Sequence, residues 1–232
     1  MTEPRRLIAP IRHTVILILV FLATAAYGAY LQHAAGDRAQ LVASRGSALP
    51  LYLTLIVMEW MLLYFVFFGI RKTGTRLRDL VGPGWATPGA VARDVALALV
   101  VWFVWRTAEA VVDRALGPDT AKGVGTLLPR GPMEIGVWIV LSVSAGICEE
   151  AVFRGYFQAQ FRALWGSAAL AVAVQAVVFG VAHGYQGVRN VITITVLGLV
   201  YGAVVVWRRN LRPTMILHAW MDVVGGILGA RG

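Results

Sequence analysis

The sequence predicts an all-α protein, a bundle of about seven transmembrane helices with the N-terminus in the cytoplasm. Three observations support this prediction: an apolar composition, a series of long apolar runs, and an uneven distribution of Lys and Arg between them. Of the 232 residues, 58% are hydrophobic and 14% are charged, and the mean hydropathy is +0.70. Soluble domains carry about a quarter charged residues, so this is the composition of a polytopic membrane protein. At roughly 20 residues per span, the chain has no room for a separate soluble domain.

The apolar runs predict the helices one by one. They cover residues 14–31, 51–70, 91–112, 133–161, 167–183, 188–207 and 213–230. A signal peptide is the alternative for the first run, but its apolar core is long and no convincing A-x-A cleavage site follows. Gly and Pro mark the boundaries, as in VGPGWATPGA before the third run and LWGS before the fifth. The fourth run contains no proline, so we expect one long helix that continues well past Glu150.

Lys and Arg are concentrated in alternate connecting segments. With a cytoplasmic N-terminus, thirteen fall on the cytoplasmic side and seven on the other, while Arg106 lies inside the third run. The cytoplasmic group is Arg5, Arg6, Arg12, Arg71, Lys72, Arg76, Arg78, Arg93, Arg154, Arg162, Arg208, Arg209 and Arg212. The other group is Arg38, Arg45, Arg114, Lys122, Arg130, Arg189 and Arg231. Cytoplasmic segments carry the excess of positive charge, which favours this orientation. The net charge of +9 follows from these clusters, so we expect no nucleic-acid partner.

Ionisable side chains at membrane depth are costly and mark functional sites. The candidates here are Glu59, Arg106, Glu109, Glu149, Glu150, Arg154, His183, His218 and Asp222. Glu150 and Arg154 are four residues apart, so on a helix they face each other and can neutralise one another. Glu149 is rotated by about 100° from Glu150 and is left to point into the bundle. The alternative is that both glutamates extend to the cytoplasmic interface.

Two histidines occur where they can join Glu149. If the fourth and fifth helices form an antiparallel hairpin with its turn near Gly166, then Glu149 and His183 lie at equal depth. On the last helix His218 and Asp222 are four residues apart and share one face. Alternatively, His183 is an ordinary core histidine, and His218 and Asp222 are incidental residues near an interface.

Such a set of carboxylates and imidazoles can activate a water molecule. Glu149 beside His183 can act as a general base, while His218 and Asp222 can stabilise the oxyanion of a tetrahedral intermediate. Alternatively, Glu149, His183 and His218 bind one Zn²⁺ with water in the open position. Both arrangements hydrolyse an amide bond within the membrane. No serine or cysteine is an obvious nucleophile, although Cys148 is adjacent to Glu149.

Three segments in order, EEAVFR, FGVAH and HAWMD, resemble the motifs EExxxR, FxxxH and HxxxN/D. These motifs characterise the CAAX prenyl protease and bacteriocin-processing family of intramembrane proteases. The resemblance covers about residues 133–230, so we divide the chain into N-terminal transmembrane helices at 1–132 and a family core at 133–232. It implies an endopeptidase, labelled metalloprotease or glutamate-type, that acts on a peptide or protein substrate in or near the lipid bilayer.

The resemblance also implies roles for individual residues. Glu149 corresponds to the water-activating glutamate, with His183 as its partner, and Glu150 and Arg154 correspond to a supporting ion pair. His218 corresponds to an oxyanion or metal-binding residue. Asp222 stands at the N/D position, where an ionised carboxylate cannot donate a hydrogen bond to an oxyanion.

Two other functions fit the same composition. One is a binding, immunity or scaffold protein of the same family that has no turnover. The other is a proton-coupled transporter, because chains of Glu and His serve as proton relays in membranes, although the sequence has no inverted repeat. Abundant Ala, Val and Arg suggest a GC-rich bacterial genome and hence the bacterial plasma membrane.

Overall fold

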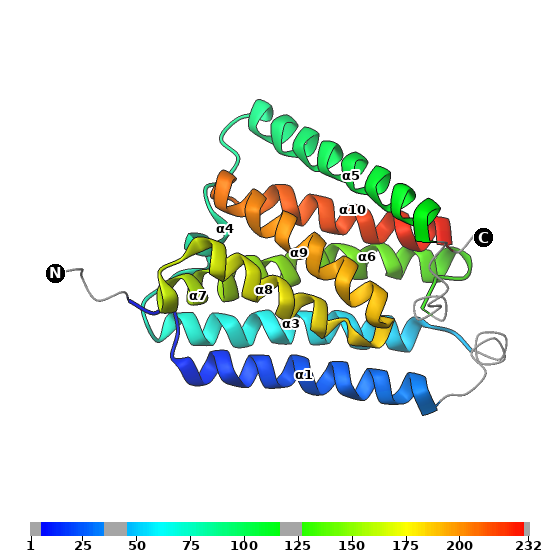
Figure 1. Cartoon of the computed structure of the whole chain (residues 1–232), viewed down its shortest axis with the longest axis horizontal. Coiled ribbons are helices and arrows are strands. Elements are labelled where there is room, and N and C mark those ends of the chain that lie inside the picture. The colour runs from blue at the N-terminus through cyan, green and yellow to red at the C-terminus, as the bar shows by residue number, and fades with distance from the viewer. Residues whose placement is uncertain (1–5, 35–45, 117–126, 230–232) are drawn as a thin grey trace.

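The computed structural model describes residues 6–34, 46–116 and 127–229, and within these ranges it contains helices and no strand (Figure 1). The elements are α1 (Ile11–Ala34), α3 (Leu49–Arg71), α4 (Leu77–Val81), α5 (Pro88–Leu116), α6 (Gly131–Glu150), the π-helical segment η1 (Ala151–Phe157), α7 (Gln158–Trp165), α8 (Ala168–Ala182), the 3₁₀ turn η2 (Gly184–Gln186), α9 (Val188–Arg208) and α10 (Arg212–Gly229). The predicted class, an all-α transmembrane bundle, is confirmed.

Each predicted apolar run corresponds to a helical part of this set, although residues 167 and 183 flank α8 and residue 230 lies outside the described residues. Five helices are long and apolar enough to cross a membrane: Ile11–Leu31, Leu49–Arg71, Pro88–Val111, Gly131–Trp165 and Val188–Arg208. α8 is apolar but has only 15 residues, and α10 is outside this group. The number of seven crossings and the cytoplasmic N-terminus therefore stay predictions.

The fourth predicted helix does continue past Glu150, as one helical segment of 35 residues that ends at Trp165. Its middle, however, is π-helical over Ala151–Phe157, which the sequence did not predict. A π turn closes over five residues rather than four and often marks a functional site. Arg154 lies in this segment and is buried, so counting it among the loop cations was wrong. The charge bias becomes twelve against seven, because thirteen minus Arg154 leaves twelve.

The hairpin between α7 and α8 turns where the sequence predicts it. Gly166 adopts a left-handed conformation with φ of 73°, which glycine reaches without steric cost and which commonly ends a helix. Ser167 then caps α8, since its hydroxyl accepts a hydrogen bond from the Leu170 backbone N–H at 3.2 Å. The two helices therefore run side by side in opposite directions (Figure 1).

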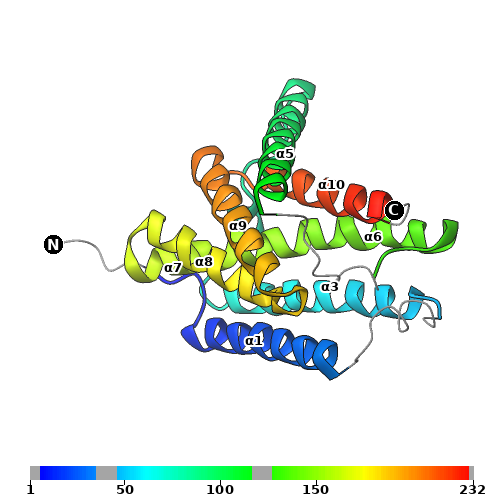
Figure 2. The ribbon, with the colours of Figure 1, turned by 45° about the vertical axis from the view of Figure 1, so that its right-hand side comes forward.

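Glycines allow two pairs of helices to approach closely. A Cβ atom on Gly146 of α6 would lie 2.8 Å from the backbone nitrogen of Ala219 on α10. A Cβ atom on Gly180 of α8 would overlap the side chain of Thr195 on α9. Small residues at such contacts bring helix backbones together in membranes. As a result α10 lies along α6, and α9 crosses α8 (Figure 2).

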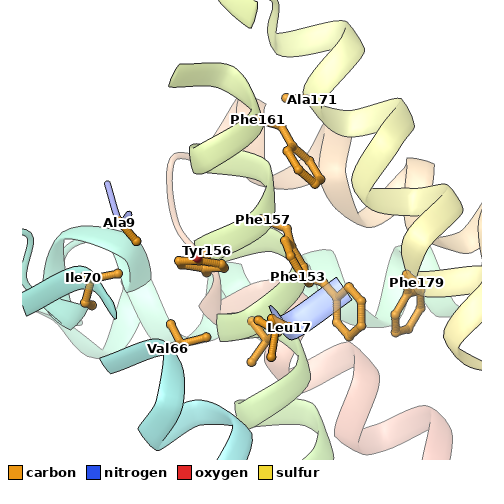
Figure 3. Close-up of a cluster of buried hydrophobic side chains, with 11 residues drawn as sticks. Ala9, Leu17, Val66, Ile70, Phe153, Tyr156, Phe157, Phe161, Ala171 and Phe179 are labelled. Atoms are coloured by element: carbon orange, nitrogen blue, oxygen red, sulfur yellow. The ribbon is translucent and has the colours of Figure 1, made fainter. Parts of the chain in front are cut away.

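The largest buried cluster joins η1 and α7 to α1, α3 and α8 (Figure 3). Phe153, Phe157 and Phe161 follow one another along η1 and α7, and the rings of the last two stack at 5.5 Å between centroids. Phe179 of α8 meets Phe153 edge-on at 4.9 Å. This aromatic packing fixes α8 against η1, and so it fixes the end of α8, where His183 lies.

Candidate active site

Glu150 connects three helical elements through one oxygen atom. Its Oε1 accepts a hydrogen bond from Nη1 of Arg154 at 2.8 Å and another from Nδ1 of His218 at 3.0 Å. The side chains of Glu150 and Arg154 are both 0% exposed. The ion pair predicted from the four-residue spacing is therefore present and lies inside the bundle, and neither residue extends to the interface.

The Arg154 guanidinium is enclosed by aromatic rings as well as by the carboxylate. Its central carbon lies 4.0 Å from the ring centre of Phe179 and 5.0 Å from that of Tyr201. Cation–π contacts of this kind strengthen when they are shielded from water. The arginine therefore has neighbours on α8 and α9 in addition to Glu150, and it acts as a structural centre behind the site.

Glu149 faces the other way, toward two imidazoles. Its Oε2 lies 3.9 Å from Nε2 of His183 and 3.9 Å from Nε2 of His218. The same oxygen is buried and has no hydrogen-bond partner within the described part of the chain. Distances of 3.9 Å are too long for direct hydrogen bonds but leave room for one water at about 2.8 Å from each atom.

The partners of the two Nδ1 atoms determine how the rings face Glu149. Nδ1 of His183 lies 2.8 Å from the carbonyl oxygen of Phe179, which can only accept, so this nitrogen carries a proton. Nδ1 of His218 likewise donates to the Glu150 carboxylate. In a neutral His183 ring the lone pair is therefore on Nε2, the atom turned toward Glu149.

Asp222 lies beside His218, as its spacing predicts. Its Oδ2 is 3.6 Å from Nε2 of His218. Its backbone oxygen accepts a hydrogen bond from the Trp138 indole at 3.0 Å, which attaches α10 to α6 one turn beyond His218. Nε2 of His218 therefore lies near two carboxylates, those of Glu149 and Asp222.

Two cavities meet at Glu149. One, of about 460 Å³, lies among α3, α6, α10 and η2 and includes His218 and Asp222 in its wall. The other, of about 500 Å³, lies between α1, α3 and η2 and is lined mainly by apolar side chains. The residues common to both walls are Leu55, Glu59, Leu127, Glu149, His183 and Tyr185. A molecule bound in either cavity therefore has access to Glu149 and His183.

The sequence did not place two further residues in the site. Tyr185 of η2 stacks near His183, with ring centres 6.1 Å apart and planes at 30°, and no pattern in the sequence indicated it. Glu59 of α3 lies within hydrogen-bonding reach of Glu149; as an ionisable residue in an apolar run it was noticed but given no role. Arg106 and Glu109 form an ion pair on α5 and are absent from both cavity walls.

Cys148, the residue before Glu149, is fully buried in a small apolar cluster with Leu63 and Ala151. It belongs to neither cavity wall. The thiol therefore packs as a small apolar group and is not presented to a substrate in the way that a nucleophile must be.

A carboxylate and two imidazoles are donor types that zinc accepts. In the described ranges, however, no three His, Cys, Asp or Glu residues form a group that could hold a metal ion. With zinc about 2.0–2.1 Å from each donor, the donors of a tetrahedral site lie about 3.3–3.4 Å from one another, and here each imidazole nitrogen lies 3.9 Å from the Glu149 oxygen. As placed, the three side chains do not form a zinc site.

The fold and the site together define a helical membrane protein with a buried carboxylate and two imidazoles at the junction of two cavities. Residues 131–224 match the model of the family described as type II CAAX prenyl endopeptidase Rce1-like. The match agrees with the resemblance to the CAAX prenyl protease and bacteriocin-processing proteins, and it covers a segment of less than half of the chain. It contains α6 through most of α10 and hence Glu149, His183 and His218. No curated protein matches the chain, and no solved structure does.

The matched family is one of CAAX-type proteases, and such a family implies a peptide or protein substrate. The helices long enough to cross a membrane make the chain an integral membrane protein. α1, α3 and α5 precede the matched segment. Even so, α3 lines both cavities, and α1 lines the apolar one.

Proposed function

We propose that the protein is an intramembrane endopeptidase that hydrolyses a peptide bond with a water held by Glu149, His183 and His218. The observation that supports this most directly is the unpartnered Oε2 of Glu149, which faces two imidazole nitrogens at equal distances of 3.9 Å. A buried carboxylate oxygen without a donor needs an external group to satisfy it. A water in that position would touch a base and two ring nitrogens at once.

In the first step Glu149 removes a proton from the water as its oxygen bonds to the carbonyl carbon of the substrate. His183 orients the water, because its Nε2 accepts a hydrogen bond while its Nδ1 donates to Phe179. Base catalysis of this kind contributes typically about 10²–10⁴-fold to the rate.

In the second step the carbon carries a negatively charged oxygen, which needs hydrogen-bond donors. His218 donates to it from Nε2 when the ring is doubly protonated, a form that the adjacent Glu150 and Asp222 carboxylates favour. Asp222 then supports His218 and does not contact the oxyanion as a donor. Glu149 passes its proton to the leaving nitrogen, the C–N bond breaks, and a carboxylic acid and an amine result.

The apolar cavity between α1 and α3 supports a substrate segment that is itself apolar and lies in or near the membrane. The proposal places the protein in the plasma membrane of a bacterium. By donor type, the same three side chains suggest zinc as a cofactor. The activity that remains after treatment with a chelator distinguishes a metal-assisted reaction from a metal-free one.

The test is cleavage of peptides by the purified protein in lipid nanodiscs, read by mass spectrometry, with farnesylated and unmodified peptides compared. We expect cleavage by the wild type, cleavage about 10²–10⁴-fold slower by Glu149→Gln, and normal cleavage by Glu109→Gln. Glu109 is a matched control, since it is an acidic residue of another membrane helix outside both cavities. Equal cleavage by Glu149→Gln would rule out the mechanism. Peptide binding without any cleavage would favour the scaffold function, and proton uptake coupled to a solute would favour the transporter.

A further inference from the structure

Glu59 is an acidic residue in the middle of α3, and it lies outside the segment that matches the family. It lines both cavities next to Glu149 and lies within hydrogen-bonding reach of it. The other groups around it are His218 and Asp222 of α10. The family segment therefore leaves unassigned an acidic side chain in contact with the proposed base.

The position of Glu59 against α6 is fixed on both sides along α3. At the start of the helix, Oε1 of Glu134 accepts hydrogen bonds from the backbone N–H of Ala48 at 2.8 Å and from the hydroxyl of Ser47 at 3.1 Å. Directly after Glu59, the Trp60 indole donates to the hydroxyl of Ser144 at 3.2 Å. These contacts hold the two helices in one register, so the meeting of Glu59 and Glu149 is built into the packing.

Two carboxyl groups in hydrogen-bond contact hold one proton between them, because an ionised carboxylate only accepts. Two negative charges at that distance inside a protein would repel strongly. A hydrogen bond between two such groups directs one at the other and restricts its rotation. Since one Glu149 oxygen faces the imidazoles, a donor in α3 would hold the carboxylate in that orientation.

We infer that Glu59 is a positioning residue, which donates a hydrogen bond to Glu149 and keeps its carboxylate directed at His183 and His218. The inference rests on the proposed peptidase function. It makes α3 part of the catalytic machinery, although α3 lies outside the segment that defines the family. The alternative is that Glu59 contacts only water in the cavity and has no influence on the orientation of Glu149.

Two substitutions distinguish these cases. Glu59→Gln keeps a donor of the same shape, so we expect kcat within about threefold of the wild type. Glu59→Leu removes the donor, and we expect kcat to fall by about 10- to 100-fold with little change in KM, since a small misplacement of a catalytic group costs this much. Glu109→Leu on α5 is the matched control and should leave both constants unchanged.

A second measurement tests the contact without relying on turnover. Melting temperatures are compared for Glu59→Leu, Glu149→Leu and the double variant, because contacting residues give shifts that do not add. Additive shifts, or a Glu59→Leu protein with normal kcat, would overturn the inference. The inference would also fail if a folded Glu59→Gln protein lost as much kcat as Glu59→Leu does. That result would give Glu59 a role in proton transfer instead. If the wild type cleaves no peptide, the proposed function fails, and the melting cycle still decides whether the two carboxyls are coupled.

Discussion

Nδ1 of His218 lies 3.0 Å from Oε1 of Glu150, so the last helix is hydrogen-bonded to the second of the two adjacent glutamates, the one that is absent from both cavity walls. The contact joins the EEAVFR and HAWMD segments, which are far apart in the sequence. It also decides which ring nitrogen of His218 is turned toward Glu149. The two glutamates thus have separate tasks: Glu150 holds Arg154 and His218 in place, and Glu149 faces the cavity.

Arg154→Ala should damage folding more than chemistry. The substitution leaves the Glu150 carboxylate without its cation in a site where both side chains are 0% exposed, and breaking such a pair costs about 3–5 kcal/mol. We expect a lower melting temperature and poor accumulation in the membrane. Arg162→Ala, an exposed residue of α7, is the control and should melt like the wild type. Normal accumulation of Arg154→Ala together with complete loss of cleavage would instead make the arginine catalytic.

Glu149→Gln should keep the fold and lose turnover. The amide has the shape of the carboxylate but cannot accept the proton of the water, so kcat should fall by about 10²–10⁴-fold with an unchanged melting temperature. His183→Ala should have a similar effect. The double variant should be little worse than either single one, because residues that act on one water act as a unit. Multiplying losses in the double variant would show that the two groups act independently.

Chelation should leave the activity intact if the metal-free reaction is correct. In the described residues no group of three could hold a metal, so protein treated with 1,10-phenanthroline and dialysed should cleave peptide at the untreated rate. Metal analysis of the purified wild type should find zinc at well below one ion per chain. Loss of activity that zinc restores would establish the metal-assisted form, with Glu149, His183 and His218 as the donors to test by substitution.

The orientation of the bundle can be measured by cysteine labelling. The native Cys148 is fully buried, so a membrane-impermeant maleimide should report mainly on an introduced cysteine. Arg78 lies in α4, at the basic end of the bundle, and Arg114 lies in the last turn of α5, and each is replaced by cysteine in turn. With a cytoplasmic N-terminus, only Arg114→Cys should be labelled in intact cells, and Arg78→Cys only after the cells are opened. The reverse pattern would invert the assignment.

Local helix geometry made much of the site predictable. The i,i+4 spacing placed Glu150 against Arg154, and the Gly166 turn placed Glu149 at the level of His183, because both relations depend on one helix or one hairpin. The roles of these residues stay predictions. The prediction that His218 joins Glu149 and His183 depended on the family motifs more than on the spacing of residues in the sequence.

Contacts made by separate helices were not predictable in this way. Glu59 meets Glu149 only because α3 packs on α6 in one register, and an isolated Glu in an apolar run contains no information on that packing. Tyr185 is a single aromatic residue in a short connection, and nothing in its neighbours distinguishes it. The π-helical form of Ala151–Phe157 also has no signature, since an apolar run satisfies either kind of helix.

That π-helical stretch makes the site dependent on the phase of a single helix. If the same seven residues, Ala151–Phe157, formed a regular α-helix, each turn would close over one residue fewer. The side chains before the segment would then turn by about 100° relative to those after it. Glu149 and Glu150 would leave their places opposite α8 and α10, although composition and hydropathy had not changed. A relative in which this segment is a regular α-helix with the same number of residues would keep the membrane protein and lose the arrangement of its acidic pair.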